Sequence, residues 1–239
     1  MNIDTLVRDN VKDMSSYSSA RDDFKNEFDK KLTYLDANES PFDNGINRYP
    51  DNKHTELKNT VSKIKNVNVN QVVFGNGTDE ILDLIVRVFC NPNKDKIITL
   101  PPTYGMYDVI AETNGVKNIK IPLKSDFSID KNEILKLSSK TTKILFLCSP
   151  NNPTGNSFDT NDLTDLIKGF NGVVVVDEAY IDFSSKQSLI SLINDNNNLI
   201  ITQTMSKAYG MAGIRLGMGF SNEKIINYLN KIKPPYNVN

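Results

Sequence analysis

The sequence predicts an α/β fold with a mostly parallel central sheet. From about residue 54 onward, short runs rich in β-branched residues alternate with longer amphipathic runs, which is the pattern of strands joined by crossover helices. The wholly apolar run VVVV at 173–176 is typical of a strand that is buried on both faces, as strands of parallel sheets are. These two observations favour a layered domain with helices packed on the sheet.

Each predicted element follows from its local pattern. Strands are expected, in chain order, at 72–75 (VVFG), 96–100 (KIITL), 117–122 (KNIKIP), 143–149 (KILFLCS), 173–179 (VVVVDEA) and 199–206 (LIITQTMS). Apolar residues at helical spacing predict helices at 78–89 (TDEILDLIVRVF), 104–115 (YGMYDVIAETNG), 159–170 (DTNDLTDLIKGF) and 186–195 (KQSLISLIND), and a further helical segment begins at His54. Residues 1–33, rich in Asp, Lys and Ser, are expected to form an N-terminal arm before the main domain at 34–239.

The composition excludes several classes of function. The 239 residues include 28 basic and 29 acidic side chains, a formal net charge of -1, so no global field attracts nucleic acid or an anionic membrane. No stretch reaches the roughly 18 apolar residues of a membrane span, and the charged first residues lack the apolar run of a signal peptide. We therefore expect a cytoplasmic protein whose partner is a small molecule.

Few residues suit a disulfide framework or a metal. Cys90 and Cys148 have no paired spacing and are expected to be buried structural thiols. His54 is the single histidine, and no second histidine, cysteine pair or acidic cluster surrounds it in the sequence. We interpret His54 as structural and expect no metal site.

Three polar segments follow predicted strands and are expected to form the ligand site. They are SPNNPTG (149–155), DEAY (177–180) and TMSK (204–207). In open α/β sheets the ligand binds beyond the carboxyl ends of the strands. The three segments should therefore converge on one side of the sheet although they are far apart in the sequence.

Lys207 and Asp177 are the residues with the clearest chemical meaning. A lysine amine forms a Schiff base with the aldehyde of pyridoxal phosphate, and a carboxylate then keeps the pyridine nitrogen protonated so that the ring accepts electrons. Tyr180, three residues after Asp177, is a candidate donor to the phenolic oxygen of the ring. Taken alone, Lys207 would more often be a surface residue. Asp177 with Glu178 would also suit helix capping or a nucleotide-fold metal site, but the sequence lacks the phosphate loop with lysine that such a site needs.

Two turns and one aromatic residue add weaker signals. GNGTDE (75–80) combines a glycine turn with the start of a helix whose free N–H groups suit a phosphate. SPNNPTG either presents the Asn152 side chain in a fixed direction or is a plain turn. Tyr104 begins a predicted helix on the same side of the sheet, where its ring could stack on a flat cofactor.

Taken together, GNGTDE, PPTYGMY, SPNNPTG, VVVVDEAY and TMSKAYGMAGIR resemble, in order and spacing, the large domain of fold-type I aminotransferases. The segments SSYSSARDD (15–23), LDANESPF (35–42) and NRYPD (47–51) narrow the resemblance to the histidinol-phosphate aminotransferases. The resemblance covers nearly the whole chain. It implies a three-layer α/β/α sandwich, the large domain of the pyridoxal-phosphate-dependent transferase fold.

The resemblance also implies an activity and a set of site residues. The activity is a transaminase reaction of histidine biosynthesis that interconverts histidinol phosphate and 2-oxoglutarate with imidazole acetol phosphate and L-glutamate. The catalytic residues would be Lys207, which holds pyridoxal 5'-phosphate as an aldimine and moves the substrate's α-proton, Asp177 on the ring nitrogen and Tyr180 on the phenolic oxygen. The remaining implied contacts are Asn152 on the phenolic oxygen, Tyr104 stacked on the ring, Thr78, Asp79, Thr204, Ser206 and Arg215 around the cofactor phosphate, Tyr49 reaching that phosphate from the neighbouring subunit of a homodimer, and Tyr17, Asn38 and Asn152 facing the substrate.

One departure from the family lies at the end of the chain. The resemblance implies a C-terminal small domain beyond Asn239, which this chain lacks, and family members carry there the arginine that grips the substrate carboxylate. Other interpretations of the same motifs are an aromatic aminotransferase, a phosphothreonine decarboxylase and a truncated cofactor-binding module without catalysis. An NAD-binding protein would need a glycine-rich turn of dinucleotide spacing, which GNGTDE does not provide.

Overall fold

The computed structural model describes residues 1–18 and 33–239. Its centre is a seven-stranded sheet in the order β1-β7-β6-β5-β4-β2-β3. The strands are β1 (Val72–Asn76), β2 (Lys96–Thr99), β3 (Lys117–Lys120), β4 (Thr142–Cys148), β5 (Val173–Asp177), β6 (Leu199–Thr204) and β7 (Leu216–Ser221). Neighbouring strands from β3 across to β6 are parallel, and β7 runs antiparallel to both β6 and β1. The sheet is mostly parallel, as the sequence predicts.

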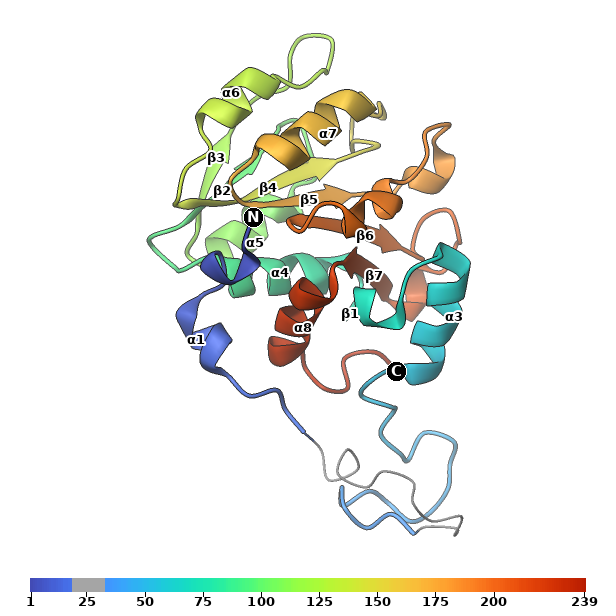
Figure 1. Cartoon of the computed structure of the whole chain (residues 1–239). Coiled ribbons are helices and arrows are strands. Elements are labelled where there is room, and N and C mark those ends of the chain that lie inside the picture. Colours follow the sequence, from blue (N-terminus) through green and yellow to red (C-terminus); the bar gives the residue numbers. More distant parts are fainter. Residues whose placement is uncertain (19–32) are drawn as a thin grey trace.

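Helices cover both faces of the sheet, which confirms the predicted three-layer sandwich (Figure 1). One face packs against α4 (Thr78–Phe89), α5 (Met106–Thr113) and α8 (Glu223–Ile232). The other face packs against α3 (Thr55–Lys65), α6 (Lys131–Lys136), α7 (Thr160–Gly169) and the short 3-10 helix η4 (Leu189–Asn194).

The central strand β5 contributes side chains to the hydrophobic cores on both faces of the sheet. Successive side chains of a strand point to opposite faces. Val173 and Val175 accordingly lie in the core beneath α4 and α5, whereas Val174 and Val176 lie in the core beneath α7. All four valines are essentially inaccessible to solvent, so the apolar run at 173–176 is a strand buried on both faces, as predicted.

All six predicted strands are present, but β7 was not predicted from its sequence LGMGFS. Glycine weakens a strand because it has no side chain to pack, and β7 contains Gly217 and Gly219. The structure shows why glycine is needed there. A Cβ atom on Gly217 would collide with the backbone of Gly77 and Thr78 at the start of α4, and one on Gly219 would lie 2.8 Å from Val73 Cγ1.

The helix predicted at 186–195 is shorter and tighter than expected. Only the six residues of η4 are helical, and they form a 3-10 helix. The Ser188 hydroxyl accepts a hydrogen bond from Ile190 N and donates one to the buried Glu178 carboxylate. These two hydrogen bonds fix the position of Ser188 at the start of η4. The bond from Ile190 N to the Ser188 hydroxyl is a local side-chain bond, and such bonds compete with the backbone bonds of a regular α-helix.

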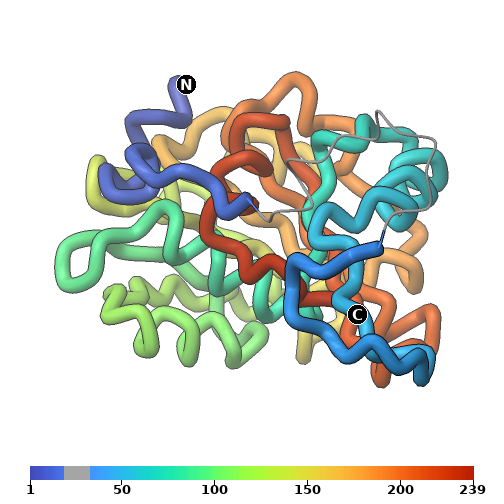
Figure 2. Tube along the Cα trace, turned by 90° about the horizontal axis from the view of Figure 1, so that it is seen from below, coloured from blue at the N-terminus to red at the C-terminus, as the bar shows by residue number. Residues whose placement is uncertain are grey.

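The first residues of the chain lie outside the sheet and pack against α8. Ile3, Leu6, Val7 and Val11 are buried in the same core as α4 and α8, and α1 (Asp9–Asp13) lies beside α8 in both ribbon views (Figures 1 and 2). Asp4 accepts hydrogen bonds from Lys224 Nζ at 2.6 Å and from the Tyr228 hydroxyl at 2.8 Å. Most of the segment 15–23 that carries part of the family resemblance lies outside the described residues.

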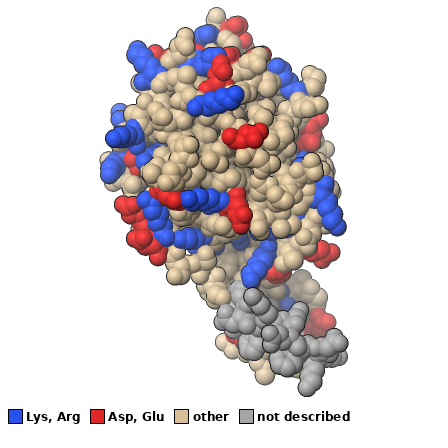
Figure 3. All heavy atoms as spheres, viewed as in Figure 1, with Lys and Arg blue, Asp and Glu red and all other residues tan. Residues whose placement is uncertain are grey.

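Acidic and basic side chains are intermixed over the face shown in Figure 3. In the described part of the chain, no helix is long and apolar enough to cross a membrane. Cys90 and Cys148 are both buried and free, as predicted.

Candidate active site

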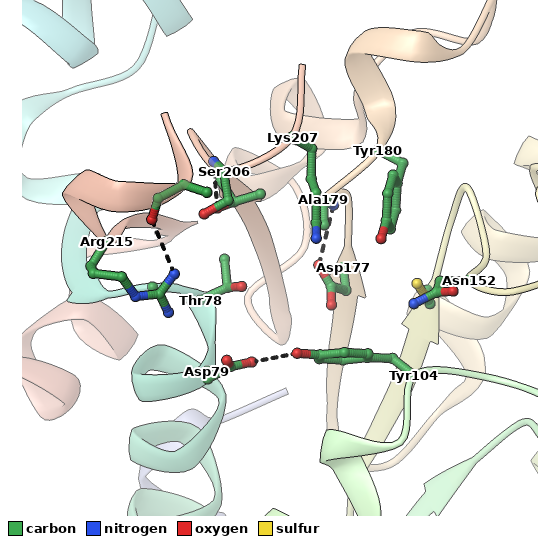
Figure 4. A pocket seen from close by; sticks show the side chains of 14 residues that line it. Thr78, Asp79, Tyr104, Asn152, Asp177, Ala179, Tyr180, Ser206, Lys207 and Arg215 are labelled. Atoms are coloured by element: carbon green, nitrogen blue, oxygen red, sulfur yellow. Dashed lines mark hydrogen bonds between the residues drawn. The ribbon is translucent and has the colours of Figure 1, made fainter. Parts of the chain in front are cut away.

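A cavity of about 210 Å³ opens at the carboxyl ends of β4, β5 and β6, beside the first turn of α4 (Figure 4). The three polar segments that the sequence analysis singled out after these strands all contribute to it. The residues that line the cavity are Gly77, Thr78, Asp79, Tyr104, Cys148, Asn152, Asp177, Ala179, Tyr180, Thr204, Ser206, Lys207, Ala212 and Arg215. The predicted convergence of distant segments is therefore present in the structure.

Asp177 is the last residue of β5, and its carboxylate is buried, with 2% of the residue exposed. Three donors hold it in place. The Tyr107 hydroxyl donates to Oδ2 at 2.8 Å, and the Thr202 hydroxyl and the Ala179 N–H donate to Oδ1 at 3.0 and 3.2 Å. Burial raises the pKa of Asp177 above its ordinary value, while these three hydrogen bonds oppose the rise. A buried carboxylate of this kind is suited to holding a cation in the cavity.

Glu178 points away from the cavity because side chains alternate along β5. Its carboxylate accepts hydrogen bonds from the Ser188 hydroxyl, from Leu189 N at 2.7 Å and from Gln203 Nε2 at 2.9 Å. The carboxylates of Asp177 and Glu178 therefore point to opposite faces of the sheet. They do not form the acid pair of a nucleotide-fold metal site.

Lys207 lies three residues beyond the end of β6 and reaches into the cavity from the loop that follows. Its Nζ is 5.5 Å from the centroid of the Tyr180 ring. In Figure 4 the side chain points toward Asp177 and lies between Ser206 and Tyr180. Gly210 N donates to Lys207 O at 3.0 Å, and Met211 N donates to Met205 O at 3.0 Å, so the loop is closed on itself around the lysine.

The opposite end of the cavity is built for an anion. Gly77 adopts a φ of 75°, which glycine tolerates, and its N–H donates to Arg215 O at 2.5 Å. A Cβ atom on Gly77 would lie 2.5 Å from Arg215 Nη2, so glycine lets the guanidinium group lie against the turn. The twelve-residue helix α4 begins at Thr78, and its N-cap residue, Gly77, has no side chain that could cap it. Its N–H groups and the Arg215 guanidinium thus face the same space, an arrangement that favours phosphate.

Tyr104 and Asp79 interact with each other inside the cavity. The Tyr104 hydroxyl donates to Asp79 Oδ1 at 3.1 Å, and burial with the nearby Asp79 charge raises the pKa of Tyr104 to about 12. The carboxylate of Asp79 therefore orients the ring of Tyr104. Only the backbone N–H of Asp79 is suited to a phosphate, since a carboxylate would repel it.

Several expected site residues lie elsewhere within this chain. Tyr17 is 62% exposed and borders a second cavity beside His54 and Lys233. Tyr49 stacks on the ring of Tyr236, with centroids 4.5 Å apart. Asn38 is exposed and adopts a φ of 54°. None of Tyr17, Asn38 and Tyr49 lines the cavity around Lys207.

The residues that support the carboxylate were not predicted from the sequence. Tyr107 and Thr202 contact Asp177, and Cys148 borders the cavity from the end of β4. Thr202 lies opposite Asp177 in the parallel register of β5 and β6, so an alignment of the two strand ends would have found it. Tyr107 carries no comparable local signal, because its position depends on how α5 packs on the sheet.

The donor set of the cavity fits pyridoxal phosphate. At one end of the cavity, Arg215, Ser206 and the start of α4 form a site suited to the phosphate group of the cofactor. At the other end, the buried carboxylate of Asp177 is suited to a protonated ring nitrogen. The amine of Lys207 is available to an aldehyde between these two ends (Figure 4). Each part of the cofactor thus has a chemically matched partner among the lining residues.

Comparisons with known proteins agree with this geometry. The family model for aminotransferase class I and II matches residues 26–239. A histidinol-phosphate aminotransferase of Flavobacterium psychrophilum is 56% identical over 238 residues, which is 100% of this chain and 68% of that relative. The crystal structure of the histidinol-phosphate aminotransferase from Clostridium acetobutylicum is 26% identical, with a TM-score of 0.72 over 80% of this chain and 57% of that one.

A third similar protein, the histidinol-phosphate aminotransferase from Sinorhizobium meliloti in complex with pyridoxal-5'-phosphate, has a TM-score of 0.74 at 23% identity. It aligns over 80% of this chain and 53% of its own. At that identity the likeness shows the fold alone. The chain spans about two thirds of the length of its curated relatives and somewhat more than half of the solved structures.

Proposed function

Since the chain belongs to the aminotransferase class I and II family, we propose that it is the cofactor-binding part of a pyridoxal-phosphate-dependent transaminase acting on histidinol phosphate. The reaction exchanges an amino group between histidinol phosphate with 2-oxoglutarate and imidazole acetol phosphate with L-glutamate, in histidine biosynthesis. The single observation that carries the proposal is that Lys207 and the buried Asp177, from two different strand ends, face one cavity with an anion site at its other end.

Different lining residues are proposed to bind different parts of the cofactor. Arg215, Ser206 and the N–H groups at the start of α4 bind its phosphate, and the carboxylate of Asp177 keeps its ring nitrogen protonated. Tyr104 would pack against the cofactor's ring, and Asn152 and Tyr180 would donate hydrogen bonds to its phenolic oxygen. When bound, the cofactor supplies an aldehyde for the lysine and a ring that accepts electrons from the substrate's α-carbon.

Lys207 has two tasks in this proposal. Its amine would condense with the cofactor's aldehyde with loss of water. Once the substrate's amine had replaced it, the free amine of Lys207 would accept the proton from the substrate's α-carbon and donate it to the carbon of the former aldehyde. The short loop closed by the bonds Gly210 N to Lys207 O and Met211 N to Met205 O keeps the amine near both positions. Tyr180, whose ring lies 5.5 Å from Nζ, limits the space on one side of it.

We propose that the substrate side of the site is completed by a second copy of this chain. Tyr17, Asn38 and Tyr49 do not line the cavity of their own chain, although the resemblance assigns them to substrate and cofactor phosphate. At the mouth of the cavity the loop after Lys207 exposes Tyr209, Met211 and Ile214, between 41% and 55% of each. Exposed apolar side chains gathered beside a site support an interface there.

The cofactor assignment is tested by absorption spectroscopy. Purified protein is mixed with pyridoxal phosphate, reduced with borohydride and digested, and the modified peptide is identified by mass spectrometry. We expect a visible band that reduction fixes onto Lys207, and no such band in Lys207→Ala. Lys168→Ala, which changes an exposed lysine on α7, serves as the matched control and should keep the band. A label scattered over many lysines of the wild-type protein would contradict the proposal.

The substrate assignment is tested by product analysis. L-Glutamate is offered with imidazole acetol phosphate, and formation of histidinol phosphate is followed by mass spectrometry. Aromatic amino acids and phosphothreonine are offered in parallel. Turnover of aromatic amino acids alone, or release of carbon dioxide from phosphothreonine without amino transfer, would overturn the substrate assignment and leave the cofactor assignment intact.

A further inference from the structure

Tyr107 occupies an unusual position for a polar side chain. It lies in the first turn of α5 and is 1% exposed. Its ring stacks on that of Phe146 in β4, with centroids 4.8 Å apart and an interplanar angle of 8°, and meets the ring of Tyr104 edge-on at 5.6 Å. Two aromatic contacts therefore fix the direction in which the hydroxyl of Tyr107 points.

That hydroxyl points at the carboxylate of Asp177. The bond to Oδ2 is 2.8 Å long, and burial together with the charge of Asp177 raises the pKa of Tyr107 well above its ordinary value of 10. The hydroxyl keeps its proton under these conditions and can act only as a donor to the carboxylate. Among the hydrogen bonds that lower the pKa of Asp177, the bond from Tyr107 is the largest cause, followed by those from Thr202 and Ala179.

We propose that Tyr107 is a positioning residue that, together with Thr202, holds Asp177 as an oriented carboxylate and thereby maintains the positive charge on the cofactor's ring nitrogen. This inference rests on the proposed function. Asp177 makes no ion pair with Lys or Arg among the residues that the structure describes, so its charged form depends on hydrogen-bond donors. The other ionisable groups that face it or lie near it are Asp79, Tyr104, Cys148, Tyr180 and Lys207.

The expected effect of losing this hydroxyl has a definite direction. A carboxylate with fewer donors is more basic and competes more strongly for the proton on the ring nitrogen. The ring then carries less positive charge, and the cofactor is held less tightly. Because a nearby positive charge favours loss of the proton from the nitrogen that joins Lys207 to the cofactor, the pH at which the visible band changes should move upward.

The test compares Tyr107→Phe with the wild-type protein. The substitution removes one oxygen atom and keeps the ring that packs between Phe146 and Tyr104. We expect the dissociation constant for pyridoxal phosphate to rise about tenfold, the size typical of one hydrogen bond to a charged group, and the pH midpoint of the visible band to rise by about one unit. Thr202→Val, which removes the second hydroxyl, should shift both quantities in the same direction.

A matched control comes from α8. The Tyr228 hydroxyl also donates to an aspartate, Asp4 Oδ1, at 2.8 Å, but far from the cavity. Tyr228→Phe should change the stability of the protein without moving the pH midpoint of the band. A midpoint that is the same in Tyr107→Phe and in the wild type, while the band itself is present, would overturn the inference. Absence of the band in the wild type would instead contradict the proposed function, so the two failures are distinguishable.

Discussion

The carboxyl group of Asp177 lies in the core at the end of β5, where burial raises its pKa above the ordinary value of 3.8. A carboxyl whose pKa is higher in the folded than in the unfolded protein binds its proton more tightly when folded. Its contribution to stability therefore falls as the pH rises from the unfolded value through the folded one. The ionised form of this buried carboxyl therefore destabilises the fold at pH values above its folded pKa.

We predict that Asp177→Asn changes how the stability of the cofactor-free protein depends on pH. The amide is always neutral, and its oxygen can still accept from Thr202 and Ala179. The melting temperatures of wild type and variant should be similar near pH 4, and the variant should become the more stable of the two as the pH rises toward 8. Thermal unfolding at a series of pH values measures this difference. A difference that does not change with pH would mean that burial does not dominate the pKa of Asp177.

At the scale of residues, the sequence located side chains that line the cavity but not the side chains that hold them in place. Lys207 and Asp177 were found because strand ends are local features of the sequence. Tyr107 was missed because its contact with Asp177 joins residues 70 positions apart and depends on the packing of α5. Asp79 is expected near the cofactor phosphate; its side chain accepts a hydrogen bond from the Tyr104 hydroxyl, so its backbone N–H is the group suited to that contact.

At the scale of elements, β7 is the strand against which the start of α4 packs, at one end of the cavity. Gly217 lies between Gly75 of β1 and Thr204 of β6 in the sheet register. The backbone of Gly77 and Thr78 passes directly over it. The start of α4 can approach the sheet this closely only because position 217 has no side chain.

We predict that Gly217→Ala lowers the stability of the protein by about 1 to 3 kcal/mol, because an added methyl group in a packed site forces the neighbouring backbone to move. It should also weaken the binding of pyridoxal phosphate, since the backbone that moves carries the phosphate site. Chemical denaturation and cofactor titration measure the two effects. Gly213→Ala is the control, because nothing lies within 4 Å of its added Cβ. Equal stability of the two variants would contradict the packing argument.

The same glycines explain the limit of element prediction. Six strands were found from β-branched and apolar runs, and α4 was predicted with its observed bounds of 78–89. The sequence LGMGFS shows no such run, so β7 could be recognised only from its place between β1 and β6. The predicted helix at 186–195 is longer than η4, because the hydrogen bond from Ser188 to Glu178 that fixes the start of η4 is a tertiary contact and cannot be predicted from the local sequence.

At the scale of the whole molecule, the first residues of the chain stabilise the layer formed by α4 and α8. Leu6 is 7% exposed within this core. We predict that Leu6→Ala costs about 2 kcal/mol or more, as buried leucine truncations do, and chemical denaturation measures it. Leu35→Ala is the control, because Leu35 is 85% exposed, and it should change the stability by less than about 0.5 kcal/mol. Similar losses for both variants would show that the N-terminal contact contributes little.

The layer architecture was predictable because alternating strands and helices admit few arrangements. The order of the strands in the sheet was not, because local patterns do not report which strands are neighbours. The packing of Ile3, Leu6, Val7 and Val11 on α4 and α8 was also missed, because their helical spacing predicts an apolar face but does not reveal which elements cover it.

The place of β1 in the sheet has a consequence for how the protein is made. Among the described residues, β1 is an edge strand that pairs with β7, which follows it by about 140 residues. On the ribosome, β1 and α4 are synthesised long before β7, and β2, β4, β5 and β6 are also complete before it. Contacts between residues so distant in sequence form slowly. The start of α4, whose backbone packs against Gly217, is therefore fixed on the sheet only after β7 has been made, later than the end of β5 that carries Asp177.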